Sequence, residues 1–220
     1  DLLTKTDYMF NECMDLTHLD FSNFNAKLVT NMNNMFTGCG INKIDLSRFN
    51  TQNVTNMDSM FSCCPELTEL DLSSFNTENV IKMNSMFLCC DQLKRIDLSS
   101  FNTKKVKGME SMFQECRSLE SLNLSSFNTL NVNSMSYMFN QCESLETLNL
   151  SNFNTQRVKE MESMFNGFNS LKYLNISNFN SQNVENMTEM FSDCISLEKN
   201  KLITKDQKIL DTFDKDKFKR

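Results

Sequence analysis

The chain contains 220 residues, 40% of them hydrophobic and 23% charged, which suits one medium-sized domain or a short repeat array with a buried core. The formal net charge of −6 argues against a nucleic-acid partner, because surfaces that bind nucleic acid are basic. No run approaches the roughly 18 apolar residues of a membrane helix, so the sequence predicts no direct membrane insertion. The 16 Met, 19 Phe and 9 Cys, beside 4 Gly and no Trp, indicate that one short unit has been copied many times.

Phe-Asn pairs mark the repeated unit. The first step between pairs is 25 residues and the following five are 26, and this fixed period predicts a solenoid. The short step reflects one residue missing between Cys39 and Ile41. The pairs are Phe24-Asn25, Phe49-Asn50, Phe75-Asn76, Phe101-Asn102, Phe127-Asn128, Phe153-Asn154 and Phe179-Asn180.

The unit that begins at Leu70 shows the predicted elements in order. Leu70 and Leu72 alternate with outward residues, which predicts a short strand, and residues 75–77 form a corner. The apolar residues that follow are spaced as on one face of a helix: Val80, Met83, Met86, Phe87 and Cys90. We therefore expect an α/β leucine-rich-repeat solenoid of about seven strand–helix units. Its parallel strands, about 4.8 Å apart, would form the concave sheet, and its helices would cover the convex side.

The unit LDLSSFNTENVIKMNSMFLCCDQLKR, residues 70–95, resembles the 26-residue surface-protein repeat of the BspA-like leucine-rich repeat family. The resemblance covers roughly residues 3–198. That family includes surface proteins and lipoproteins of low-GC bacteria, and similar repeats occur in some protists. The resemblance implies a surface-displayed or secreted protein that serves in adhesion or ligand binding. It carries no active site to this chain.

The two ends differ from the repeats. Residues 1–198 form the expected array, in which residues 1–18 are either a half repeat that continues upstream, where a signal or lipid-attachment segment could lie, or an N-terminal cap. Residues 199–220 form a charged tail, read as a capping helix over 205–219 or, alternatively, as a linker. A capping box is expected at Thr204 and Gln207, and the apolar stripe of the helix would comprise Ile209, Leu210, Phe213 and Phe218.

The methionine and cysteine columns are predicted to fill the core, because both side chains pack well in apolar surroundings. The cysteine column accepts Phe168 in one repeat, which favours buried free thiols over a ligand column. Nine cysteines cannot all pair within the chain. The tandem pairs Cys63-Cys64 and Cys89-Cys90 leave a zinc site as the alternative there.

The outward positions of the strands are the candidate ligand-binding surface. One column carries four Asp and then three Asn, read either as a solvated stripe or as a Ca²⁺ site. The position before each strand varies from repeat to repeat, and Arg95 and Tyr173 are plausible contacts there. The tentative ligand-binding residues on this concave face and its edge are Asp45, Asp71, Asp97, Arg95, Asn123, Asn149 and Tyr173.

Catalysis is not expected, since the single histidine, His18, has no partner marked by a motif, and no phosphate loop or cofactor motif occurs. We therefore predict a non-enzymatic interaction or adhesion module without a cofactor, at the cell surface or secreted, that binds a protein or a glycan. The alternative is an intracellular structural subunit held within a larger assembly.

Overall fold

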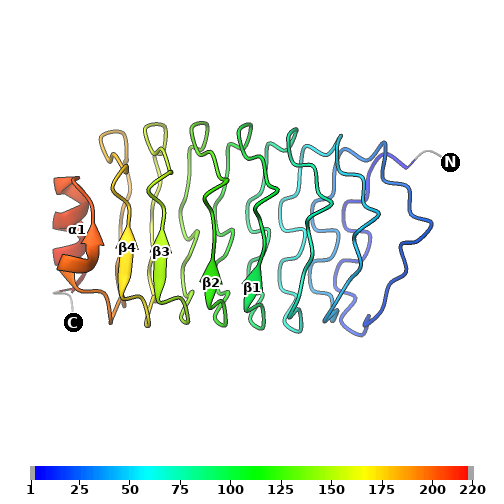
Figure 1. The fold of residues 1–220 in the computed structure, drawn as a ribbon, viewed down its shortest axis with the longest axis horizontal. Helices are drawn as coiled ribbons and strands as arrows, with labels where there is room; N and C mark the ends of the chain where they lie inside the picture. Colours follow the sequence, from blue (N-terminus) through cyan, green and yellow to red (C-terminus); the bar gives the residue numbers. More distant parts are fainter. Residues whose placement is uncertain (1–2, 218–220) are drawn as a thin grey trace.

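The computed structural model describes residues 3–217 and forms an elongated solenoid whose successive turns lie side by side (Figure 1). Short parallel strands pair between neighbouring turns. Strand β1 (Arg95–Ile96) pairs with β2 (Ser121–Leu122), so that Arg95 lies opposite Ser121. This register shifts by one 26-residue repeat, as the sequence period predicts.

Three further strands form a second sheet, in the order β3 (Thr147–Asn149), β4 (Tyr173–Asn175) and β5 (Leu202–Ile203), all parallel. The short 3-10 helix η1 (Lys199–Lys201) precedes β5, and helix α1 (Gln207–Lys217) closes the end of the array. The expected repeat solenoid and its parallel strands are therefore confirmed.

The expected helices on the opposite side of each repeat are wrong. Within residues 3–217, α1 is the only α-helix, and the segments that carry the paired methionines are successive turns. Isolated parallel bridges connect these turns from repeat to repeat, as between Asn56 and Lys82 and between Lys82 and Gly108. We call this second ladder of backbone pairing the turn face, and the surface of β1–β5 and the equivalent segments the strand face.

Left-handed backbone conformations explain why no helix forms. Ser59 and Cys63 have φ values of 55° and 53°, and the equivalent residues of the other repeats also have positive φ. Such residues cannot continue a right-handed helix, and a positive φ at the third of four residues is typical of a type II turn. The N–H groups of Ser59, Phe61 and Cys63 instead donate to carbonyls of the next repeat, at 2.8, 3.0 and 2.6 Å.

Two turns in succession bury the same positions as one face of a helix, and for this reason the apolar spacing was misleading. The predicted inward stripe is nevertheless confirmed, because Met83, Met86, Phe87 and Cys90 are fully buried. Met9, by contrast, is 40% exposed although it lies in a methionine column.

Stacked phenylalanine rings run through the core. Rings of the turn face lie 5.5–6.0 Å apart from Phe36 to Phe191, and Phe213 of α1 packs edge-on against Phe191 at 5.3 Å. The Phe of the corner pairs stack likewise, as Phe127 does on Phe153 at 6.5 Å. Offset stacking of this kind adds about 0.5–1.5 kcal/mol per pair beyond burial.

The corner asparagines bond the backbone of their own corner. The Oδ1 atom of Asn102 accepts the N–H of Lys104 at 3.2 Å, and the other six corner asparagines bond in the same way. The bond to the next repeat comes from the threonine that follows. The hydroxyl of Thr103 donates to the carbonyl of Asn128 at 2.9 Å and accepts its N–H at 2.7 Å.

Helix α1 supplies the last repeat with the bonds that a further repeat would make. In the preceding repeat the N–H of Phe165 donates to the carbonyl of Met190. The equivalent N–H of Phe191 donates instead to the carboxylate of Asp216, at 3.0 Å. Asp206 accepts both the N–H and the hydroxyl of Ser181 at 2.7 Å. Asp206 also accepts the N–H of Ile209 at 3.2 Å, so it caps the helix.

The capping box expected at Thr204 and Gln207 is wrong, because Asp206 occupies that role and Gln207 donates instead to Asp211. The helix lies within the expected range 205–219, with Ile209 and Phe213 buried and Leu210 partly buried. Phe218 lies outside the described residues.

Replacing Asp216 by alanine tests this cap. Asp216→Ala leaves the buried N–H of Phe191 without an acceptor, so we expect a loss of about 1–3 kcal/mol in the free energy of unfolding, measured by urea denaturation. The matched control is Asp211→Ala, an exposed acid of the same helix, for which we expect a change within about 0.5 kcal/mol. Equal losses in the two variants would contradict the role given to Asp216.

Candidate ligand-binding groove on the strand face

A depression of about 790 Å³ opens on the strand face, lined by residues 68–71, residues 94–97 and Glu120. Its floor is apolar, because Leu70 and Ile96 lie there and are only 7% and 8% exposed to solvent. The period-2 alternation of these strands places their charged neighbours on the rim. The groove therefore joins an apolar base to charged walls, as ligand sites commonly do.

Two neighbouring depressions extend this groove along the array. One, of about 380 Å³, reaches back to His18 and shares Glu69 and Asp71 with the main depression. The other, of about 360 Å³, reaches forward to Thr147 and shares Ile96 and Asp97. Because they share walls, the three depressions form one groove that crosses several repeats.

The charges on the rim are only loosely paired. Glu120 lies 3.7 Å from Arg95 and 3.9 Å from Lys94, and the side chain of Arg95 is 78% exposed. Lys43 and Glu69 lie 2.8 Å apart but are also well exposed. Exposed pairs of this kind contribute about 0–1 kcal/mol, so a partner can replace them at small cost.

The column of aspartates and asparagines next to the groove has a local structural role. Each side chain accepts the backbone N–H of the residue two positions on, a serine in every repeat, as Asp71 does from Ser73 at 2.9 Å. An amide oxygen accepts the same bond as a carboxylate, which explains the change from Asp to Asn. The members are Asp20, Asp45, Asp71, Asp97, Asn123, Asn149 and Asn175.

The same bonds favour the ionised carboxylates. The backbone N–H and the hydroxyl of the serine two residues on lower the pKa of Asp71 and of Asp97. The hydroxyl and the N–H of Ser47 lower the pKa of Asp45. The remaining lone pairs of these carboxylates are acceptors, whereas the Nδ2 groups of the asparagines are donors. The strand face thus changes from acceptors to donors along the array.

The Ca²⁺ and zinc alternatives receive no support from the geometry. In residues 3–217, no group of three or more His, Cys, Asp or Glu side chains is arranged to hold a metal ion. Cys64 and Cys90 are buried, and their thiols donate to the carbonyls of Phe36 and Phe61 at 3.1 Å. The buried-thiol interpretation of the column is confirmed for Cys39, Cys64, Cys90, Cys116, Cys142 and Cys194, while Cys13 is half-buried.

The structure brings together three of the residues that the sequence singled out. Asp71, Arg95 and Asp97 line the main depression. Asp45 lines the depression toward His18, and Asn123 lines the one toward Thr147.

Two predicted residues lie farther along the array. Asn149 on β3 and Tyr173 on β4 lie outside these depressions, and Tyr173 is 37% exposed. The sequence reasoning missed Lys94 and Glu120 as wall residues. Their one signal was that each is a charged side chain directly after the last leucine of its repeat unit.

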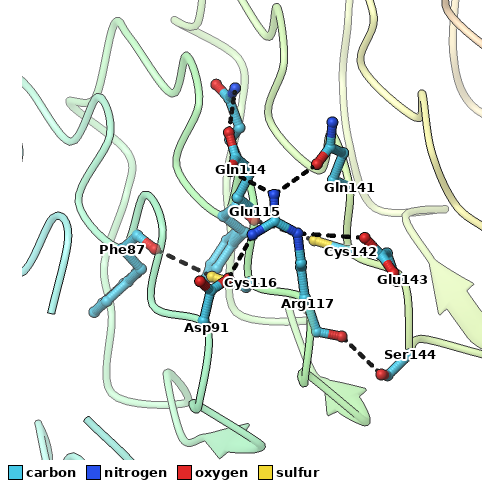
Figure 2. Close-up of polar contacts among 11 residues, drawn as sticks. Phe87, Asp91, Gln114, Glu115, Cys116, Arg117, Gln141, Cys142, Glu143 and Ser144 are labelled. Carbon is cyan, nitrogen blue, oxygen red and sulfur yellow. Dashed lines mark hydrogen bonds and ion pairs between the residues drawn. The ribbon is translucent and has the colours of Figure 1, made fainter. Parts of the chain in front are cut away.

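A second polar cluster, also missed, surrounds Arg117 at the end of the turn face (Figure 2). Its guanidinium lies 3.1 Å from Asp91, 2.7 Å from Glu115 and 3.3 Å from Glu143. These acids belong to three successive repeats, so Arg117 connects them. Desolvation opposes the charge, but the surrounding carboxylates outweigh it and raise the pKa of Arg117. The guanidinium also donates to Oε1 of Gln141 at 2.9 Å, so its bonding partners all come from within the cluster.

The parallel ladders and the repeat spacing define a leucine-rich-repeat-like solenoid protein. A profile of the family described as "Mycoplasma protein of unknown function, DUF285" matches residues 4–122 and 83–205. The two matches together span most of the chain, which therefore belongs to this family. No curated protein matches the chain. None of the helices in the described part of the chain is long and apolar enough to cross a membrane.

Solved structures similar to the chain include a leucine-rich repeat protein from Eubacterium ventriosum, at 18% identity and a TM-score of 0.38, over 81% of this chain and 53% of that one. The functional domain of InlJ from Listeria monocytogenes, described as including a cysteine ladder, is 15% identical with a TM-score of 0.37, over 86% and 46%. The Toll–Spatzle complex of Drosophila is 17% identical with a TM-score of 0.33, over 71% and 24%. The chain thus spans about half the length of the first of these proteins and a smaller share of the other two.

Acid titration tests the bonding of the aspartate column. The pKa values of Asp45, Asp71 and Asp97 are lower in the folded than in the unfolded chain. Their contribution to stability is therefore present above the unfolded pKa, about 3.9, and is lost as the pH falls through the folded pKa. Changing all three to asparagine keeps the turn bond, so we expect a smaller loss of melting temperature below about pH 4.

The control for this titration is Glu78→Gln, which removes an exposed carboxylate at a corner. We expect this variant to follow the acid profile of the unmodified chain. Identical profiles for the triple variant and the unmodified chain would contradict the preferential bonding of the ionised carboxylates.

Proposed function

We propose that the array is a non-enzymatic interaction module that binds an extended polypeptide ligand along the groove of the strand face. The observation that carries this proposal is the continuity of the groove over several repeats, with Leu70 and Ile96 at its floor. Repeat solenoids typically use such extended surfaces for binding rather than chemistry.

The charges on the groove favour a ligand of mixed polarity. Asp71 and Asp97 offer acceptors beside the main depression, and Arg95 extends its exposed guanidinium over the same region. Asn123 then begins the donor half of the column. A bound peptide would place basic side chains over the aspartates and carbonyl or acidic groups toward the asparagines. Such complementarity sets the orientation of the ligand more than its affinity.

A peptide-display library selected on the purified array tests the groove. We expect the selected sequences to be rich in Lys and Arg and to bind less tightly as the salt concentration rises. Asp71→Asn with Asp97→Asn keeps the turn bonds and removes two charges. We expect this variant to weaken binding of the selected peptides by about tenfold, at about 1.4 kcal/mol per factor of ten. Its melting temperature at neutral pH should fall only slightly, because the amides keep the turn bonds and lose only their charge-assisted part.

The matched control is again Glu78→Gln, which removes a negative charge away from the groove and should leave binding unchanged. Equal weakening by both variants would show a general charge effect and contradict a specific site. Selection of no peptide, together with binding on a glycan array that the groove variants weaken, would assign the face to a glycan instead.

We further propose that the module serves in adhesion at the cell surface or in secreted form. The resemblance of residues 70–95 to the surface-protein repeat supports this location. Protease treatment of intact cells should then remove the array while cytoplasmic proteins persist. Protection of the array until the cells are lysed would contradict surface display and favour the intracellular subunit, whose partners cross-linking would identify.

A further inference from the structure

Cys63 and Cys89 occupy equivalent positions in successive repeats of the turn face. Both have left-handed backbones, with φ of 53° and 56°. The N–H of Cys63 donates to the carbonyl of Leu88 at 2.6 Å, and the N–H of Cys89 donates to Gln114 at 2.8 Å. The two cysteines are therefore register partners in neighbouring rungs of the ladder.

These two thiols differ from those of the buried cysteine column. Cys63 is exposed and Cys89 is half-buried, whereas Cys64 and Cys90 beside them are fully buried and bonded to backbone carbonyls. Within residues 3–217, Cys63 and Cys89 are the only consecutive pair of cysteines in this column of left-handed residues. The full column is Glu12, Gly38, Cys63, Cys89, Glu115, Gln141, Gly167 and Asp193. A solvent-borne reagent can thus reach one member of the pair directly.

The spacing of the rungs brings the two side chains together. Partners in parallel rungs lie about 4.8 Å apart, within the Cα separation of about 4.4–6.8 Å that a disulfide spans. Burial raises the pKa of Cys89 to about 12, and the negative charge and a hydrogen bond of Cys63 add to this effect. Cys63 acts on Cys89 in this way because the two residues are neighbours in adjacent rungs.

We propose that Cys63 and Cys89 form a reversible disulfide between repeats when the protein meets a low-molecular-weight disulfide such as oxidised glutathione. The exposed Cys63 thiolate attacks one sulfur of glutathione disulfide, forming a mixed disulfide and releasing one glutathione thiolate. The Cys89 thiolate then attacks the sulfur of Cys63 and releases the second glutathione. Both cysteines give up their protons and are oxidised, and one glutathione disulfide is reduced to two thiols.

The position of the bond relates it to the groove. Residues 68–71 and 94–97, which line the main depression, each begin five residues after one of these cysteines. The disulfide would therefore connect, on the turn face, the same two repeats that line the groove on the strand face. The chemistry itself does not depend on what the groove binds.

Mass spectrometry of the purified chain tests the proposal. After treatment with oxidised glutathione and alkylation of free thiols, we expect two fewer alkylated cysteines and no retained glutathione. Trypsin, which cuts after Arg48, Lys82 and Lys94, should give residues 49–82 linked to residues 83–94. Reduction with dithiothreitol should restore both thiols, and the oxidised form should melt at a higher temperature.

Single substitutions assign the bond. Cys89→Ser should stop at one glutathione on the peptide of residues 49–82, and Cys63→Ser should form no link. Cys64→Ser and Cys13→Ser retain the pair and should form the link as the unmodified chain does. A link that persists in Cys63→Ser or Cys89→Ser, stable glutathione on both peptides, or no modification at all would each overturn the proposal.

Discussion

Backbone bonding between successive repeats governs the whole molecule. On the turn face each repeat donates alternate N–H groups to the next, so neighbouring turns must keep the same length and conformation. Equivalent side chains therefore stack, and the phenylalanine, threonine and cysteine ladders follow from that register. The one short repeat shows how strict the constraint is. At Gly40 an added Cβ would lie 1.9 Å from the carbonyl oxygen of Met14, so only glycine fits there.

The period and the inward positions could be read from the sequence, because the recurring apolar side chains mark the positions that each repeat buries. The local conformation could not, since a helix and a pair of type II turns bury the same positions. A clue was present in the glycines at positions 38 and 167, in a column where Glu115 adopts a φ of 59°. Non-glycine residues pay about 1 kcal/mol or more for this conformation, and the bonds to the next repeat offset that cost. The hydrogen bonds between repeats therefore outweigh the intrinsic backbone preference of these residues for negative φ.

The candidate site was predictable to a similar degree. An exposed aspartate column on the strands is visible in the sequence, and Asp71, Arg95 and Asp97 do meet at one depression. The continuity of the groove is not visible, because it depends on how neighbouring rungs place Glu120 and Lys94. The Arg117 cluster needs partners from three repeats at once, and one repeat read by itself does not suggest them.

The turn bond accepted by Asp71 and its equivalents has an evolutionary consequence. Aspartate and asparagine codons differ by a single base, and both side chains accept the serine N–H in the same geometry. Mutation can therefore alter the electrostatic character of the strand face one repeat at a time while the backbone stays unchanged. Members of a family built on this unit can therefore differ in surface charge while each repeat keeps its turn bond.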